Sequence, residues 1–115
     1  MSVPSPDDLL RHLREAAGQA VTYVEGLSRE DFLADKRTQQ AVILNIIILG
    51  EAATKLMDHH PATVSGFPQV EWRSMRGMRN RIAHGYYDIN LDVVWETVST
   101  ALPELIALLD EGWRE

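Results

Sequence analysis

The segment KRTQQAVILNIIILGEAATKLMDH, residues 36–59, decides the fold class of this chain. Between residues 41 and 53 it is apolar on almost every side of a helix, which is typical of a helix at the centre of a bundle. The β-branched run of Ile46, Ile47 and Ile48 could indicate a strand, but the length of the segment and its continuation EAATKL favour a helix. The sequence therefore predicts one long central helix.

Helix start and stop signals precede this segment. The sequence SPDD at residues 5–8 offers a capping serine, a proline suited to the first helical position, and acids near the positive end of the helix dipole. Apolar residues then recur at helical spacing as far as Val24, and Gly26 is expected to end this helix. A second capping serine, Ser28, predicts a short helical turn through Leu33.

Two further elements are expected after the central segment. Residues 60–68 contain two prolines and a glycine, so they are predicted to form the main loop of the chain. A helix is predicted over residues 70–83, and Gly85 is expected to close it. The connections between these elements are short, which favours helices that pack side by side.

The last helix should be capped by Asn90 or Asp92 and extend to about residue 110. Pro103 is predicted to bend this helix, because proline lacks the backbone N–H that a helix interior requires. Five helices without any alternation of strands and turns predict an all-α bundle. The chain is expected to form a single domain over residues 1–115.

The balance of charge limits what the chain can bind. It carries 11 Lys+Arg and 17 Asp+Glu, a formal net charge of −6, whereas a general nucleic-acid binder should be basic. The segment from Trp72 to Tyr87 is a local exception, with no carboxylate and four arginines: Arg73, Arg76, Arg79 and Arg81. Setting these four and Glu71 aside leaves 7 basic and 16 acidic residues, a charge of −9. Any nucleic acid must therefore be recruited to this one patch, or to two such patches related by symmetry.

The composition also indicates a compartment. The chain has no cysteine, which excludes disulfides and thiolate metal sites and suits a reducing compartment. Its N-terminus lacks the basic start and apolar run of a secretion signal, and the longest apolar run, residues 41–49, is interrupted by Asn45 and is too short to cross a bilayer. We expect a cytoplasmic protein without a membrane span.

The sequence RNRIAHGYY, residues 79–87, groups side chains that can attack a phosphodiester. Arg79 offers a fixed charge and a planar fork of donors that matches phosphate oxygens, and His84 is of the type that exchanges protons near neutral pH. Asn80 and His84 share a helix face. Arg79 and His84 diverge by roughly 140° around the helix, but they can still flank one cleft. The alternative is a solvated helix face that ends in a capping histidine.

The motifs around these residues resemble one known family. Arg79, Asn80 and His84 match the HEPN-domain signature of an arginine, a polar residue, three further residues and a histidine, and His84-Gly85-Tyr86 matches the additional H-x-Y of the HepT-like branch. The resemblance extends over essentially the whole chain, through three more motifs: LGEAA at residues 49–53, WRSMRGMRN at 72–80, and DIN at 88–90 leading into Val94-Trp95. The chain is thus similar to the HepT-like toxins of HEPN/MNT toxin–antitoxin pairs.

This resemblance implies a metal-independent endoribonuclease in which the ribose 2′-OH attacks its own phosphate and leaves a cyclic phosphate. No cofactor or metal is expected, and RNA is the expected substrate. One chain supplies one motif histidine, so a two-fold homodimer is expected to supply the second. The resemblance assigns phosphate contact and charge stabilisation to Arg79, proton transfer to His84, and positioning of the substrate or imidazole to Asn80.

The remaining candidate residues have weaker assignments. Arg73, Arg76 and Arg81 are candidates for binding RNA phosphates, although at least one of them should pair with an acid from another helix. Glu51 is expected to orient Arg76 or Arg79, because a carboxylate beside an apolar run requires a partner.

The resemblance also implies a means of control and leaves one alternative open. It implies that an MNT-type nucleotidyltransferase antitoxin binds the toxin and transfers AMP to Tyr86; the other interpretation of Tyr86 is packing between helices. The alternative for the whole chain is a non-catalytic HEPN subunit that docks a nucleotidyltransferase or a nucleotide. The RNA target and the particular antitoxin cannot be derived from this sequence.

Overall fold

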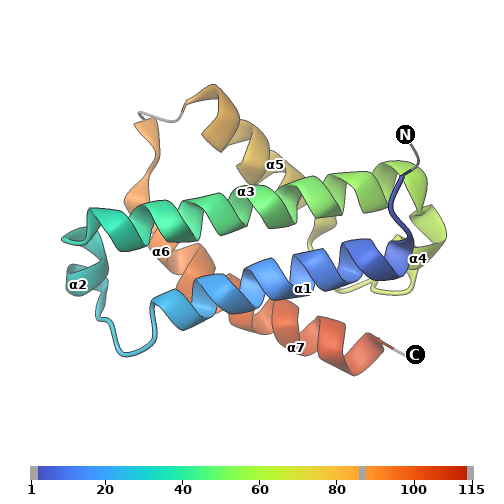
Figure 1. Ribbon diagram of the computed structural model, residues 1–115, viewed down its shortest axis with the longest axis horizontal. Coiled ribbons are helices and arrows are strands. Elements are labelled where there is room, and N and C mark those ends of the chain that lie inside the picture. The colour runs from blue at the N-terminus through green and yellow to red at the C-terminus, as the bar shows by residue number, and fades with distance from the viewer. Residues whose placement is uncertain (1–2, 86–87, 114–115) are drawn as a thin grey trace.

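The structure is a computed structural model that describes residues 3–85 and 88–113 (Figure 1). These residues form helices and connecting turns and contain no strand. The elements in chain order are α1 (Pro6–Tyr23), α2 (Arg29–Leu33), α3 (Lys36–His59), α4 (Pro61–Ser65), α5 (Trp72–His84), α6 (Leu91–Glu96), a π-helical turn (Thr97–Ala101) and α7 (Leu102–Gly112). The predicted all-α class is therefore confirmed.

The first two helices begin at the predicted capping residues. Ser5 accepts a hydrogen bond from the backbone N–H of Asp8 at 3.1 Å and starts α1. Ser28 and Asp31 form a reciprocal capping box at the start of α2. Helix α1 ends at Tyr23, and Gly26 adopts a positive φ of 77° in the turn that follows. A left-handed residue is favourable for glycine there, as the sequence indicated.

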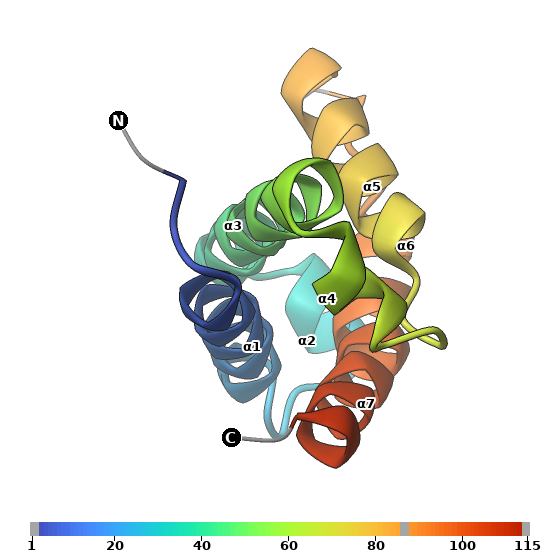
Figure 2. The same cartoon turned by 90° about the vertical axis from the view of Figure 1, so that its right-hand side faces the viewer.

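Helix α3 is the centre of the bundle and spans the predicted residues 36–59. It lies between α1 and α5, as Figure 2 shows from the end of the bundle. It is long and apolar enough to span a membrane, and half of its most apolar window is buried inside the protein. Asp35 caps it: the hydroxyl and the backbone N–H of Thr38 donate to this carboxylate at 2.6 and 3.1 Å and hold its pKa below the usual value.

Two predictions for the second half of the chain are corrected. Residues 60–68 are not wholly a loop, since Pro61–Ser65 forms α4. Pro61 occupies its first turn, where a missing N–H costs nothing, and the carbonyl of His60 accepts hydrogen bonds from the N–H groups of Thr63 and Val64. The expected helix over 70–83 is α5, which begins at Trp72 and ends at His84 before Gly85.

The predicted last helix is divided into α6, the π-helical turn and α7. Asn90, rather than Asp92, provides its cap and accepts hydrogen bonds from the N–H groups of Asp92 and Val93 at 2.9 and 3.3 Å. Pro103 lies in the first turn of α7, directly after the π-helical turn. The regular α-helix is therefore interrupted directly before the proline, which lacks a backbone N–H, whereas the predicted bend itself stays a prediction.

The core lies where α1, α3 and α7 meet, and α5 packs almost wholly on α3. Figure 1 shows α5 leaning away from α6, with which it shares few contacts. Trp95 packs against Phe32 with ring centroids 5.4 Å apart, which ties α6 to α2. The bundle thus fixes one side of α5 firmly and leaves its other side open.

Candidate functional site

Helix α5 carries the motif and divides its side chains among three directions. Trp72 and Ile82 are buried, which orients the helix on the core. Asn80 and His84 are exposed, four residues apart, and share a face at helical spacing. Arg79 lies between these two directions, on the edge of α5 next to α3.

Gly50 allows α5 to approach α3 closely enough to place Arg79. A Cβ at position 50 would lie 2.6 Å from the Cβ of Arg79 and 3.0 Å from the carbonyl oxygen of Met75. The first contact is shorter than real side chains show, the second is tighter than most, and neither atom is the far end of a flexible side chain. A glycine therefore permits this approach without a shift of the helices. Sequence reasoning recognised Gly50 only as part of a motif and did not predict its packing role.

Arg79 is held by two acceptors and is 20% exposed. Its Nη1 donates to Oε1 of Glu51, and its Nε donates to Oδ1 of Asn80 at 3.0 Å. The expected pairing of Glu51 with one of two arginines is thus met by Arg79. Within residues 3–85 and 88–113 no hydrogen bond engages Nη2, so this edge of the fork can still meet a phosphate.

The other arginines of α5 point in different directions. Arg76 donates to Asp58 at 2.6 Å and to the carbonyl of Thr54 at 3.4 Å, which neutralises its charge against α3. The expectation that one arginine pairs with an acid from another helix is confirmed by this contact. Arg73 and Arg81 are exposed and form no ion pair with a described residue. Arg81 lines the cavity between α5 and α6, on a different flank from Arg79.

His84 is exposed on the last turn of α5, and its side chain neither accepts nor donates a hydrogen bond among the described residues. The backbone ends the helix just after it, where the N–H of Gly85 donates to the carbonyl of Arg81 at 3.0 Å. Tyr86, the predicted site of modification, and Tyr87 lie outside the described residues. A single chain thus places Arg79 and His84 on one helix without enclosing them.

None of the main cavities among the described residues is lined by Arg79, Asn80 or His84. No three His, Asp or Glu side chains in that part of the chain lie close enough together to hold a metal ion. The motif residues therefore form an open, polar surface with one anchored guanidinium and one free imidazole.

An exposed apolar pair lies next to this surface. Leu44 and Ile48 are 56% and 41% exposed, although both belong to the apolar segment of α3. They are one turn apart and lie on the same stripe of the helix as Glu51. The sequence suggested a segment that is apolar all round, and so gave no signal that these two side chains point outward.

These features define a class of helical bundle with an arginine–polar–histidine motif on one surface helix, and comparison with known proteins identifies the family. A model of the HepT-like ribonuclease family matches residues 13–111. The chain belongs to this family, which confirms the resemblance that its motifs indicated.

Several relatives are similar over most of their length. A protein of Thermococcus cleftensis named "Probable ribonuclease HepT" is 34% identical over 88% of this chain and 89% of its own. A protein of Caldanaerobacter subterraneus named as a candidate RNase is 31% identical over 91% of this chain and 89% of its own. Another candidate RNase, from Methanocaldococcus jannaschii, is 29% identical over 90% of this chain and 80% of its own. No solved structure matches the chain.

Proposed function

We propose that this protein is a metal-independent endoribonuclease, the toxin of a toxin–antitoxin pair that acts in the cytoplasm. Membership of a ribonuclease family supports the reaction class. The observation that carries the proposal is Arg79, which Glu51 and Asn80 hold on two sides while one edge of the guanidinium stays available. A preoriented guanidinium is suited to the charge that develops on a phosphate during attack.

The reaction needs a base, an acid and charge stabilisation. A histidine takes the proton of the ribose 2′-OH, and the oxygen then bonds to phosphorus. The bond to the 5′-oxygen breaks, and this oxygen takes a proton from a second acid. The products are a 2′,3′-cyclic phosphate and a free 5′-OH, and no redox partner or cofactor takes part. Arg79 would stabilise the crowded phosphate, with Asn80 setting the direction of its fork.

A second copy of the chain would supply the second histidine. Two observations support a two-fold arrangement through the α3–α5 surface: the motif is not enclosed in one chain, and Leu44 and Ile48 expose apolar area beside it. Apolar side chains grouped next to a polar motif are typical of an interface. Pairing would also bring two sets of α5 arginines together, which offsets the formal charge of −6 that each chain carries.

The direct test is cleavage of a single-stranded RNA by the purified protein in excess EDTA. We expect products that end in a 2′,3′-cyclic phosphate, recognised by mass spectrometry and by 3′ ends that cannot be ligated until the phosphate is removed. Arg79→Lys should reduce the rate strongly, because ammonium keeps the charge and loses the bidentate fork. Cleavage that stops on chelation and returns with a divalent ion would contradict the mechanism. RNA left intact by the protein would favour a non-catalytic docking subunit.

We also propose that an MNT-type nucleotidyltransferase binds this protein and transfers AMP from ATP to Tyr86: the phenolic oxygen bonds to the α-phosphorus, the bond to the β-phosphate breaks, and pyrophosphate and the phenolic proton are released. Tyr86 follows His84 by two residues, so a phosphodiester there would bring bulk and negative charge close to the motif in sequence. Incubation with ATP and the cognate enzyme should raise the intact mass by about 329 Da for each AMP added and reduce RNA cleavage. The adduct should be absent from Tyr86→Phe. An adduct on Tyr23 or Tyr87 would contradict the assignment.

A further inference from the structure

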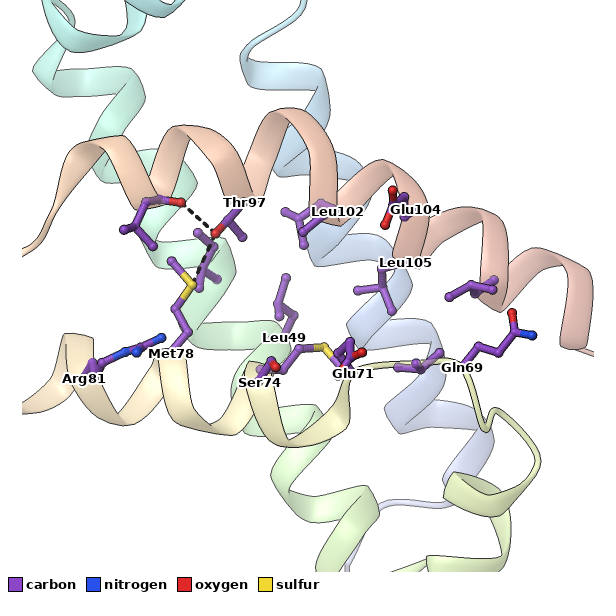
Figure 3. A pocket seen from close by; sticks show the side chains of 16 residues that line it. Leu49, Gln69, Glu71, Ser74, Met78, Arg81, Thr97, Leu102, Glu104 and Leu105 are labelled. Atoms are coloured by element: carbon purple, nitrogen blue, oxygen red, sulfur yellow. Dashed lines mark hydrogen bonds between the residues drawn. The ribbon is translucent and has the colours of Figure 1, made fainter.

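A cavity of about 320 Å³ lies between α5 and the arm formed by α6, the π-helical turn and α7 (Figure 3). Its floor is apolar, with Leu49 of α3 between the two walls and Leu102 and Leu105 on the α7 side. Met75 and Met78 line the α5 side. Thr97 donates the one hydrogen bond that crosses the cavity among the described residues, to the sulfur of Met78 at 3.5 Å.

This cavity continues in both directions along the helices. It shares Met78, Arg81 and Val93 with a second cavity toward Gly85, and Val70 and Leu108 with a third toward Gly112. The three cavities lie next to one another beside α5, and we name them together the α5/α7 groove. At 1.5 Å per residue, the 13 residues of α5 give this groove a length of about 20 Å.

The shape of the α5/α7 groove fits a helix. Both walls and the floor are helices, and the described residues contain no strand edge to which an extended peptide could add. A helix of three to four turns would match the length of α5. Apolar side chains at i, i+3 or i+4, and i+7 would lie on the floor. Methionine side chains adapt readily to an incoming apolar surface.

The charge along the groove selects a basic occupant. Glu71 stands on the α5 side, and Glu104 and Glu111 stand on the α7 side. None of the three forms an ion pair with a described residue. Among the described residues, Arg81 is the only basic side chain that lines the cavity of about 320 Å³, and it lies near one end. A helix with lysines or arginines flanking its apolar face would therefore pair with carboxylates on both walls.

A second copy of this chain does not offer such a helix. The helix richest in arginine is α5, which is itself a wall of the groove and is covered by α3 along its apolar side. Two of its four arginines are already paired, with Asp58 and Glu51. The remaining chain carries 16 acidic residues against 7 basic ones, so it would be repelled by the same carboxylates.

We propose that the α5/α7 groove is the docking site for a basic amphipathic helix, three to four turns long, of a different protein. The groove lies on a different flank of α5 from the anchored Arg79, so the partner can be bound independently of the ribonuclease surface. The apolar side chains of the partner helix pack on the floor of the groove, and its basic side chains pair with Glu71, Glu104 and Glu111.

The test uses a labelled peptide of about 15 residues, with leucine at helical spacing and lysine on both flanks. Binding to the full-length protein is measured by fluorescence anisotropy, beside a peptide with glutamate in place of lysine and a scrambled lysine peptide. We expect binding of the basic amphipathic peptide at least about tenfold tighter than that of either control. Equal binding of the acidic or the scrambled peptide, or no binding of the basic one, would overturn the proposal.

Variants locate the binding. Ala101 is exposed and lines the groove, so Ala101→Arg should obstruct it and weaken binding about tenfold. Glu104→Lys should weaken peptide binding about three- to fivefold through the change of charge alone. This variant therefore tests the proposal even if Ala101→Arg alters folding. Glu15→Lys, an exposed acid of α1 outside the groove, should bind like the wild type. Equal losses in Glu15→Lys would overturn the proposal, as would an Ala101→Arg protein that changes from dimer to monomer in gel filtration.

Discussion

Helix α5 has one flank fixed against α3 and another that opens onto the α5/α7 groove (Figures 1 and 3). On the fixed flank Gly50 permits close approach, and Arg76 and Arg79 are paired with acids of α3. On the open flank Glu71 and Glu104 face a cavity and have no described ion-pair partner.

The two flanks are suited to different roles. A guanidinium that must meet a developing charge benefits from a fixed position, since reorganisation during the reaction is then small. An unfilled apolar trough leaves contacts unmade, and these become available to a partner. The chemistry is therefore expected on the fixed flank, and recognition of a partner on the open one.

The largest effect is expected at His84. We predict that His84→Ala lowers the rate of RNA cleavage by about 10²–10⁴-fold, because it removes proton transfer. Thermal unfolding should be nearly unchanged, since this exposed side chain makes no hydrogen bond with a described residue. Cleavage by His84→Ala near the wild-type rate would show that this histidine does not transfer a proton in the reaction.

The fixed flank can be disturbed with one methyl group. Gly50→Ala should lower the free energy of unfolding by about 1–3 kcal/mol, and should also slow cleavage because α5 and Arg79 must shift away from α3. Gly77→Ala is the matched control on α5, since nothing lies within 4 Å of its added Cβ. It should raise the free energy of unfolding by about 0.5–1 kcal/mol through helix propensity. A Gly50→Ala protein as stable and active as the wild type would show that the close approach is unimportant.

The anchor of Arg79 can be separated from general ion pairing. Glu51→Gln should slow cleavage by about three- to tenfold, because a neutral amide orients the guanidinium less firmly. Asp110→Asn breaks a comparable pair with Arg14, between α7 and α1 and away from α5, and should leave cleavage unchanged. Each substitution should cost at most about 1 kcal/mol of stability, because both pairs are partly exposed. Equal losses of activity in the two variants would argue against a positioning role.

The smallest effect concerns the start of α3. The pKa of Asp35 is lowered first by the Thr38 hydroxyl and then by its backbone N–H, so the folded state binds the ionised carboxylate better than the unfolded state does. The resulting stability is present above the unfolded pKa and is lost as the pH falls through the folded pKa. The difference in urea midpoint between the wild type and Asp35→Ala should therefore be largest at neutral pH and shrink below about pH 4. A difference that is constant from pH 7 to pH 3 would contradict this account.

Sequence patterns were sufficient to predict the elements that depend on local chemistry. Capping residues such as Ser5 and Ser28 place helix starts, because they satisfy backbone N–H groups within a few residues. The apolar length of residues 36–59 defined the central helix, and the ordered motifs identified the family. Residues 61–65 were missed because a proline at the first turn of a helix resembles a proline that breaks one.

The placement of these elements depends on packing between distant segments, which local sequence patterns do not show. Spacing along α5 could not choose between Arg76 and Arg79 as the partner of Glu51, since that depends on how closely Gly50 lets two helices approach. Nor could the pattern of α3 show that Leu44 and Ile48 point outward, because a segment that is apolar all round gives no face. The α5/α7 groove likewise could not be predicted from the sequence, because it arises where packing between helices is incomplete. Local hydrogen bonds are encoded within a few residues, whereas packing depends on volumes and directions that distant segments supply together.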